Sequence, residues 1–114
     1  MIYDKNEILK RTSMGLDIFK FYLGDRFKKL GKPFRSPFYD DKKASCFVYQ
    51  DKKTGIYKFK DFGLLLSTVD CFGFMGYMFN LNSAIAGDFI EILKKINQDI
   101  LLNYGTTEDL KHKI

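Results

Sequence analysis

The chain is poor in the residues that build metal centres and disulfide frameworks. Its 114 residues include two cysteines, one histidine and no tryptophan. Structural zinc needs four donor side chains in tetrahedral geometry, and Cys46, Cys71 and His112 form no metal-spaced cluster. Two isolated cysteines in an intracellular chain are more often buried thiols, although the sequence alone leaves a Cys46–Cys71 disulfide open.

Long apolar runs are also missing. No stretch approaches the roughly 18 to 20 apolar residues of a membrane helix, and the start Met1-Ile-Tyr-Asp4 lacks the basic-then-apolar order of a signal peptide. We therefore expect a cytoplasmic protein that has no membrane segment.

Aromatic and basic residues are abundant instead. Twelve Phe and seven Tyr contribute to a hydrophobic share of 46%, which suffices for one packed domain. The formal net charge is +5, and residues 20–60 hold twelve of the nineteen Lys and Arg residues but four of the fourteen Asp and Glu residues. A basic segment of this kind is typical of a surface that faces a polyanion.

The two ends of the chain have helical spacing. Asp4 with Glu7, and Asp88 with Glu91, have the spacing of capping boxes, and Gly24 is a helix stop. Apolar residues recur every three or four positions between these signals. The spacings predict helices over residues 4–12, 13–23, 70–79 and 88–103.

The middle of the chain predicts a β-hairpin. Residues 45–50 and 56–60 form two alternating segments around a turn in which Gly55 can adopt a left-handed conformation. Strand alternation places Lys58 and Lys60 on one face, and Tyr57 and Phe59 on the other. Residues 64–69 are compatible with either a loop or a short strand.

These patterns predict one α+β domain over residues 1–114, with a small antiparallel sheet flanked by helices. N-terminal helices occupy residues 1–24, a β ribbon residues 25–69, C-terminal helices residues 70–104, and a polar tail residues 105–114.

A series of short motifs runs through most of this domain. Their order and spacing resemble the N-terminal zinc-ribbon domain of bacterial and phage DNA primases, over about residues 5–103. In chain order the motifs are Gly31-Lys32-x-Phe34, Pro37-Phe38, Asp41-Lys42, Ser45, Tyr57, Asp70 and Phe89-Ile90-Glu91.

The chain departs from that family at its zinc ligands. The matching positions hold Ser36, Tyr39, Phe59 and Phe62, and a phenylalanine cannot donate to a metal ion. We expect a degenerate zinc ribbon without metal or other cofactor, in which Tyr39, Phe59 and Phe62 converge and Ser36 lies near the rim. The alternative is that these are ordinary core residues with no metal ancestry.

No catalytic constellation is recognisable. His112 has no plausible Ser or Cys partner, and Asp40-Asp41 beside Lys42 and Lys43 is typical of a solvated turn. We therefore expect a non-catalytic protein, unless the chain is part of a larger primase.

The resemblance implies a template-binding role on single-stranded DNA in phage or mobile-element replication, in the host cytoplasm if the protein is phage-encoded. Lysines and arginines neutralise phosphates, while tyrosine rings stack on bases. The candidate contacts are Lys32, Arg35, Lys42, Lys43, Tyr49, Tyr57, Lys58 and Lys60.

Two alternatives remain open from the sequence. Lys58 and Lys60 have a second interpretation as strand lysines that discourage aggregation. The whole domain has a second interpretation as a protein-interaction module that binds a helicase, a polymerase or a primase catalytic domain.

The absence of a zinc-ligand set makes a direct prediction about metal content. Elemental analysis of the purified protein should find zinc well below one equivalent per chain, because Phe59 and Phe62 offer no donor atoms. One stoichiometric zinc ion per chain would show that other residues supply the ligands.

Overall fold

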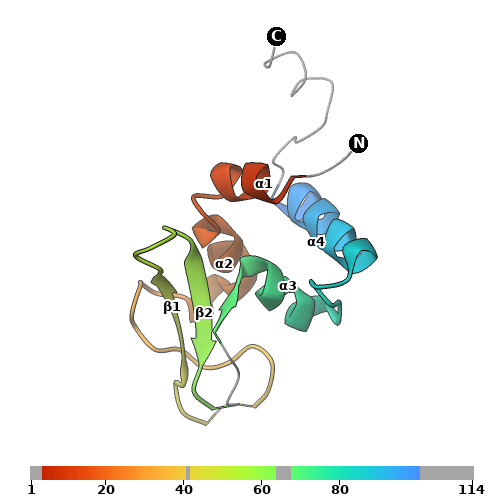
Figure 1. Ribbon diagram of the computed structural model, residues 1–114. Helices are drawn as coiled ribbons and strands as arrows, with labels where there is room; N and C mark the ends of the chain where they lie inside the picture. Colours follow the sequence, from red (N-terminus) through yellow and green to blue (C-terminus); the bar gives the residue numbers. More distant parts are fainter. Residues whose placement is uncertain (1–3, 41, 64–67, 101–114) are drawn as a thin grey trace.

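The computed structural model describes residues 4–40, 42–63 and 68–100 (Figure 1). These residues form four α-helices and a three-stranded antiparallel sheet in the order β1-β2-β3, which confirms the α+β class. The elements are α1 (Lys5–Arg11), α2 (Leu16–Leu23), the 3-10 turn η1 (Gly24–Arg26), β1 (Cys46–Gln50), β2 (Tyr57–Asp61), β3 (Val69–Asp70), α3 (Cys71–Phe79) and α4 (Ala86–Asp99).

Helix α1 begins where the sequence predicts, but its first turn is stabilised differently from a capping box. The Asp4 carboxylate accepts a hydrogen bond from the Asn6 backbone N–H at 3.0 Å. Glu7 does not reach back to the cap, because its Oε1 accepts from Arg11 Nε one turn later at 3.0 Å. The Glu7–Arg11 ion pair therefore stabilises the side of the helix and does not cap its N-terminus.

Helix α2 starts three residues later than the predicted Ser13. Ser13, Met14 and Gly15 all have positive φ angles, of 55°, 60° and 95°, which interrupt helical geometry. Gly15 is buried, and a Cβ there would lie 3.1 Å from the Cys71 sulfur. Close packing of this turn on α3 thus sets the start of α2, whereas Gly24 ends the helix as predicted.

The predicted hairpin is confirmed: β1 starts one residue later than predicted and ends where predicted, and β2 is shifted by one residue. Strands β1 and β2 pair in antiparallel register from Cys46↔Asp61 to Gln50↔Tyr57. The turn closes with the Gly55 N–H donating to the Asp51 carbonyl at 2.7 Å, and Gly55 has the expected left-handed φ of 77°. Part of the uncertain segment 64–69 forms the short strand β3, and residues 64–67 lie outside the described residues.

The two C-terminal helices are confirmed, but the capping box predicted for the second does not form. Asp70 Oδ1 accepts from the Gly73 N–H at 2.8 Å and starts α3. Helix α4 begins at Ala86, before Asp88, whose carboxylate instead accepts from the Asn82 N–H at 2.9 Å. Asp88 thus fixes the turn that leads into α4, and the predicted extension to residue 103 falls outside the described residues.

A cluster of phenylalanine rings holds the sheet against the helices. Phe59 of β2 is 2% exposed. Its ring centroid lies 6.4 Å from that of Phe19 in α2, 5.2 Å from that of Phe74 in α3, and 5.8 Å from that of Phe38 in the long loop before β1. Ring pairs at these separations add to the free energy gained by burial alone.

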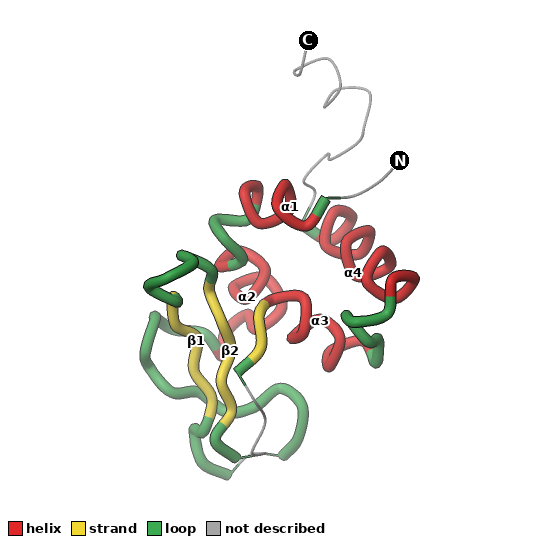
Figure 2. The backbone as a smooth tube through the Cα atoms, in the orientation of Figure 1, coloured by secondary structure: helices red, strands yellow, loops and turns green. Residues whose placement is uncertain are grey.

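The elements form successive layers behind this cluster. The hairpin lies on one side, α2 and α3 follow it, and α1 and α4 lie beyond them (Figure 2). Helix α4 buries Ile92, Leu93 and Ile96 completely, so its apolar stripe closes the core from the far side. No helix in the described ranges combines the length and apolar character needed to cross a membrane.

The alternation of buried and exposed side chains along β2 predicts different stability losses for two alanine variants. Phe59→Ala should lower the free energy of unfolding by about 3–5 kcal/mol, because it leaves a cavity among packed rings. Phe62→Ala should lower it by about 1 kcal/mol or less, because Phe62 is 60% exposed. Urea unfolding followed by circular dichroism measures both, and similar losses for the two variants would contradict the assignment of their faces.

Candidate nucleic-acid interface

The outer face of the β1–β2 hairpin brings aromatic and basic side chains together. The register pairs Phe47 with Lys60 and Tyr49 with Lys58. Directly paired residues project to the same face of a sheet, and the neighbouring residue Phe59 is buried on the helix side. Each strand therefore contributes alternate residues to a surface that we call the outer face: Phe47, Tyr49, Lys58, Lys60 and Phe62.

The rings of the outer face contact one another. The Phe47 centroid lies 5.8 Å from that of Tyr49 and 5.5 Å from that of Phe62. The Lys60 ammonium nitrogen lies 4.8 Å from the Phe62 ring centroid, a cation–π distance. Phe62 is nevertheless 60% exposed, so one large ring of this row is open to solvent beside a positive charge.

Lys58 has an acidic neighbour in the hairpin turn. Its ammonium nitrogen lies 3.4 Å from Asp51 Oδ2, and both side chains are partly exposed. The backbone N–H of Lys53, and to a smaller extent the Lys58 ammonium, lower the pKa of the Asp51 carboxyl. Asp51 therefore stays ionised and competes with any external anion for Lys58.

A shallow hollow of about 240 Å³ opens next to these rings. Its walls include all three rings of the outer face, and Ser45 and Ala44 line it near the start of β1. Gly31 and Pro33 form its remaining side. This side is held in place because the Gly31 N–H donates to the Val48 carbonyl at 3.2 Å, and Phe34 pairs with Cys46 through two backbone hydrogen bonds.

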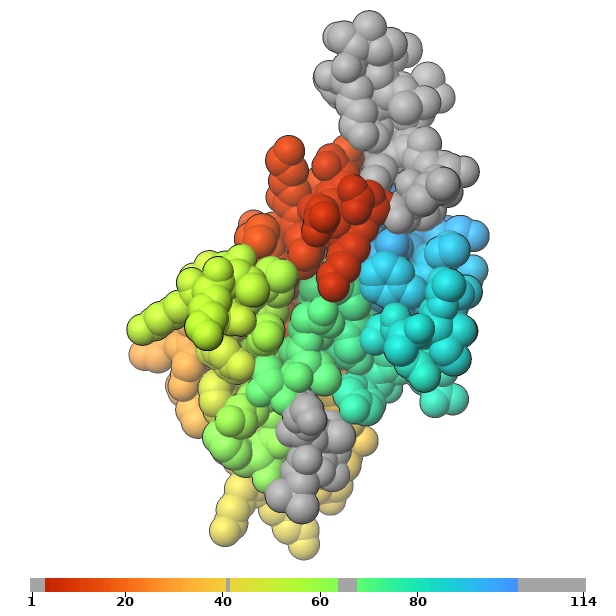
Figure 3. Space-filling view, in the orientation of Figure 1, coloured from red at the N-terminus to blue at the C-terminus, as the bar shows by residue number. Residues whose placement is uncertain are grey.

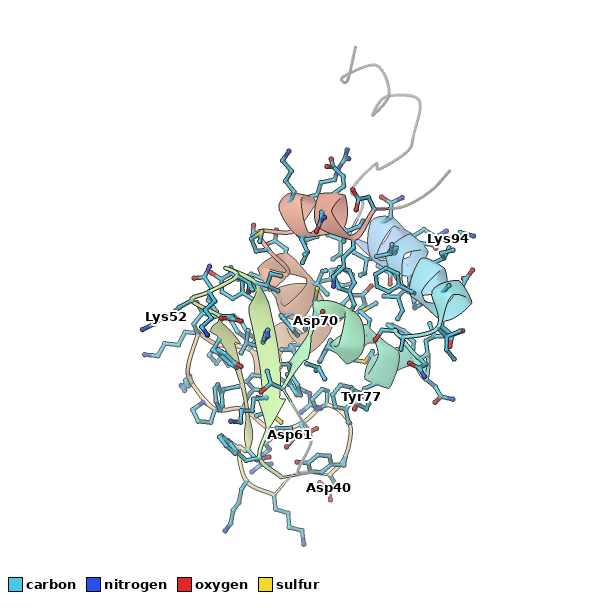
Figure 4. All side chains as sticks on the ribbon, viewed as in Figure 1. Asp40, Lys52, Asp61, Asp70, Tyr77 and Lys94 are labelled. Carbon is cyan, nitrogen blue, oxygen red and sulfur yellow. The ribbon has the colours of Figure 1, made fainter. Side chains whose placement is uncertain are left out.

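The loops around the hairpin supply further positive charge. Lys32 is exposed between the two loop residues that line the hollow, and Lys42 and Lys43 are exposed just before Ala44. Lys52 projects from the hairpin turn, away from the helices (Figure 4). Arg35 is exposed between two buried residues, and no contact places it on the outer face.

Tyr57 is the one predicted stacking residue that the structure separates from the others. It pairs with Gln50 and packs against the hydrophobic core, on the opposite face from Tyr49. Tyr49 and Tyr57 therefore do not present their rings on the same face of the sheet. Phe47 and Phe62 lie on the same face as Tyr49 instead. Phe47 is two residues from Tyr49, and Phe62 is two residues from Lys60; this spacing is the sequence signal that identifies them.

The four positions that match zinc ligands do not converge. Phe59 is buried among the core rings, whereas Phe62 lies on the outer face against Phe47. They are three positions apart along the chain, and strand alternation puts residues at that spacing on opposite faces. The expectation of one aromatic cluster at the metal position, with buried Ser36 near its rim, is therefore corrected.

A buried carboxylate occupies the end of β2 instead. Asp61 is 2% exposed, and its Oδ1 accepts from the Gly63 N–H at 2.7 Å and from the Tyr39 hydroxyl at 2.9 Å. Ser45 Oγ lies 3.1 Å from the same hydroxyl oxygen. These bonds tie the loop before β1 to the far end of the hairpin. Among the described residues, no three His, Cys, Asp or Glu side chains come together as a metal site.

The two cysteines are separate, buried thiols, so the structure contains no Cys46–Cys71 disulfide. Burial, with a smaller contribution from the Asp61 charge, raises the pKa of Cys46 to about 12. Burial also raises the pKa of Cys71. Both side chains therefore remain protonated at neutral pH and act as small core residues.

Comparison with known proteins returns no relative of this chain. No family model matches it, and neither do the curated proteins or the solved structures.

Proposed function

We propose that this protein is a non-catalytic domain that binds single-stranded DNA with the outer face of its hairpin. The observation that carries the proposal is the register of β1 and β2, which pairs Phe47 with Lys60 and Tyr49 with Lys58. A row of rings beside a row of ammonium groups is the arrangement with which proteins stack on bases and neutralise the phosphates between them.

The position of Lys58 supports binding over protection against aggregation. Lys58 and Lys60 belong to β2, which has β1 on one side and β3 on the other. Lysines that discourage edge-to-edge pairing are needed on edge strands. Strand β3 pairs with β2 at Lys58 and Phe59, so Lys58 has no free strand edge to protect and this alternative does not explain it.

The charge distribution supports a polyanionic ligand. The outer face and the loops beside it carry Lys32, Lys42, Lys43, Lys52 and Lys53 in addition to the two strand lysines. The space-filling view shows the hairpin and α4 on opposite sides of the molecule (Figure 3). Positive charge concentrated on one side steers a polyanion towards that side.

A role in replication extends the proposal through the resemblance to primase zinc ribbons. The domain would hold template DNA for a helicase, a polymerase or a primase catalytic domain, in the cytoplasm of the host if a phage encodes it. The open ring of Phe62 also favours a second candidate, in which the outer face binds a replication protein instead of DNA.

Charge reversal on β2 tests the proposal directly. Lys58→Glu combined with Lys60→Glu should weaken binding to single-stranded DNA by about tenfold or more at low salt. It should also flatten the slope of log affinity against log salt by about 1.4, since each phosphate contact on a single strand contributes about 0.7. Fluorescence anisotropy with a labelled oligonucleotide at several salt concentrations measures both quantities.

A matched control carries the same change in net charge on other elements. Lys10 on α1 and Lys94 on α4 are exposed, and Lys94 lies across the molecule from Lys52 (Figure 4). Lys10→Glu with Lys94→Glu should retain most of the affinity. Equal weakening by both double variants would show that only overall charge matters, and unchanged binding by the Lys58 and Lys60 variant would remove the strand from the contact surface.

The ion pair at the turn predicts a gain of affinity. Asp51→Asn keeps an oxygen that can accept from the Lys53 N–H but removes the charge that competes for Lys58. We expect affinity for single-stranded DNA to rise about two- to threefold at low salt, an effect on the scale of surface ion pairs. Glu91→Gln is the control, because it breaks the exposed Lys94–Glu91 pair on α4; an equal rise in both variants would rule out a local effect.

A further inference from the structure

The hollow on the outer face has the dimensions of a site for one flat ring. Its volume is about 240 Å³, below the roughly 300–1,000 Å³ of pockets that enclose drug-sized ligands. Three of its walls are the rings of Phe47, Tyr49 and Phe62. Planar walls around a small space favour a planar occupant, because stacked rings gain the most contact area for their volume.

The walls carry few polar groups that could select among bases. Ser45 contributes a hydroxyl and Tyr49 a phenol, while Pro33 and Ala44 are apolar. Stacking depends on the face of a ring, which every nucleobase has, whereas discrimination between bases needs directed hydrogen bonds. A ring bound here is therefore held mainly by its faces.

Positive charges lie next to several walls. Lys32 is between Gly31 and Pro33 in the sequence, and Lys43 precedes Ala44. Lys60 lies over the Phe62 ring at 4.8 Å. An apolar recess bordered by ammonium groups matches a nucleotide, whose base is apolar on its faces and whose flanking phosphates are anionic.

We propose that this hollow receives a single unpaired nucleobase, inserted between the three rings and the loop at Gly31 and Pro33, while the adjoining phosphates lie along the lysines. This inference rests on the proposed DNA-binding function and adds the site that distinguishes single strands from duplex. A base within a duplex is stacked on both faces and cannot enter. The site accepts different bases with similar affinity.

The test separates the contribution of the base from that of the phosphates. An oligothymidine of about 12 nucleotides, within the range that small single-strand-binding folds cover, is compared with an abasic sugar–phosphate strand of the same length and charge. The wild-type protein should bind the oligothymidine about tenfold more tightly, which is the effect of one well-stacked base. It should also prefer the oligothymidine to a duplex of equal length.

Two variants address the hollow itself. Phe62→Ala removes the exposed ring from its wall, and Ala44→Leu adds volume at an exposed position that lines it. Gly31 is unsuitable for filling the space, because its φ of 76° strains any other residue. Both variants should lose the preference for oligothymidine while keeping the wild-type affinity for the abasic strand, and neither should lose more than about 1 kcal/mol of unfolding free energy.

The outcomes distinguish this inference from the proposed function. Equal wild-type affinity for the two strands would overturn the base site, even if Lys58→Glu with Lys60→Glu still weakened both complexes. Absence of binding to either strand would overturn both proposals together. A parallel arm with oligouridine distinguishes DNA from RNA as the source of the base, and a preference over the abasic strand in either arm supports the site.

Discussion

The packing of the Phe59 ring among Phe19, Phe38 and Phe74 orients the whole hairpin. Once this ring points into the helices, strand alternation turns the neighbouring residues of β2 outwards. Lys58, Lys60 and Phe62 are consequently presented on the opposite side. The stability of the domain and the composition of its outer face therefore have a common origin in one buried side chain.

A buried polar residue also fixes the position of the outer face, in addition to the Phe59 ring. Asp61 is buried at the end of β2 and accepts hydrogen bonds from Tyr39 and Gly63. The bonds to Asp61 Oδ1 offset part of its lost solvation and hold the loop before β1 against the hairpin. That loop leads through Lys42 and Lys43 to Ala44, which lines the hollow. The aromatic rings and the nearby lysines thus depend on two anchors of different chemistry.

Much of the fold was predictable, and each error has an identifiable physical cause. The hairpin, its Gly55 turn and the faces of β2 follow from period-two alternation and turn chemistry, and both are local properties. The start of α2 was predicted too early because Gly15 packs against Cys71, a contact between residues far apart in the sequence. The prediction that Asp88 caps α4 is also wrong, because its carboxylate accepts a hydrogen bond from the Asn82 N–H. Propensity describes neighbours in the chain and carries no information about such contacts.

The sequence by itself determined the α+β class, the basic middle segment and the alternation that places Lys58 and Lys60 away from Phe59. Only the tertiary structure decided which aromatic residues accompany those lysines. The pairing of β1 with β2 brings Phe47 and Tyr49 beside them and sends Tyr57 to the core. The hollow also arises from tertiary structure, because the Gly31–Val48 hydrogen bond brings a distant loop to the edge of β1. Alternation along one strand sets the direction of each side chain, but the partners on that face come from other parts of the chain.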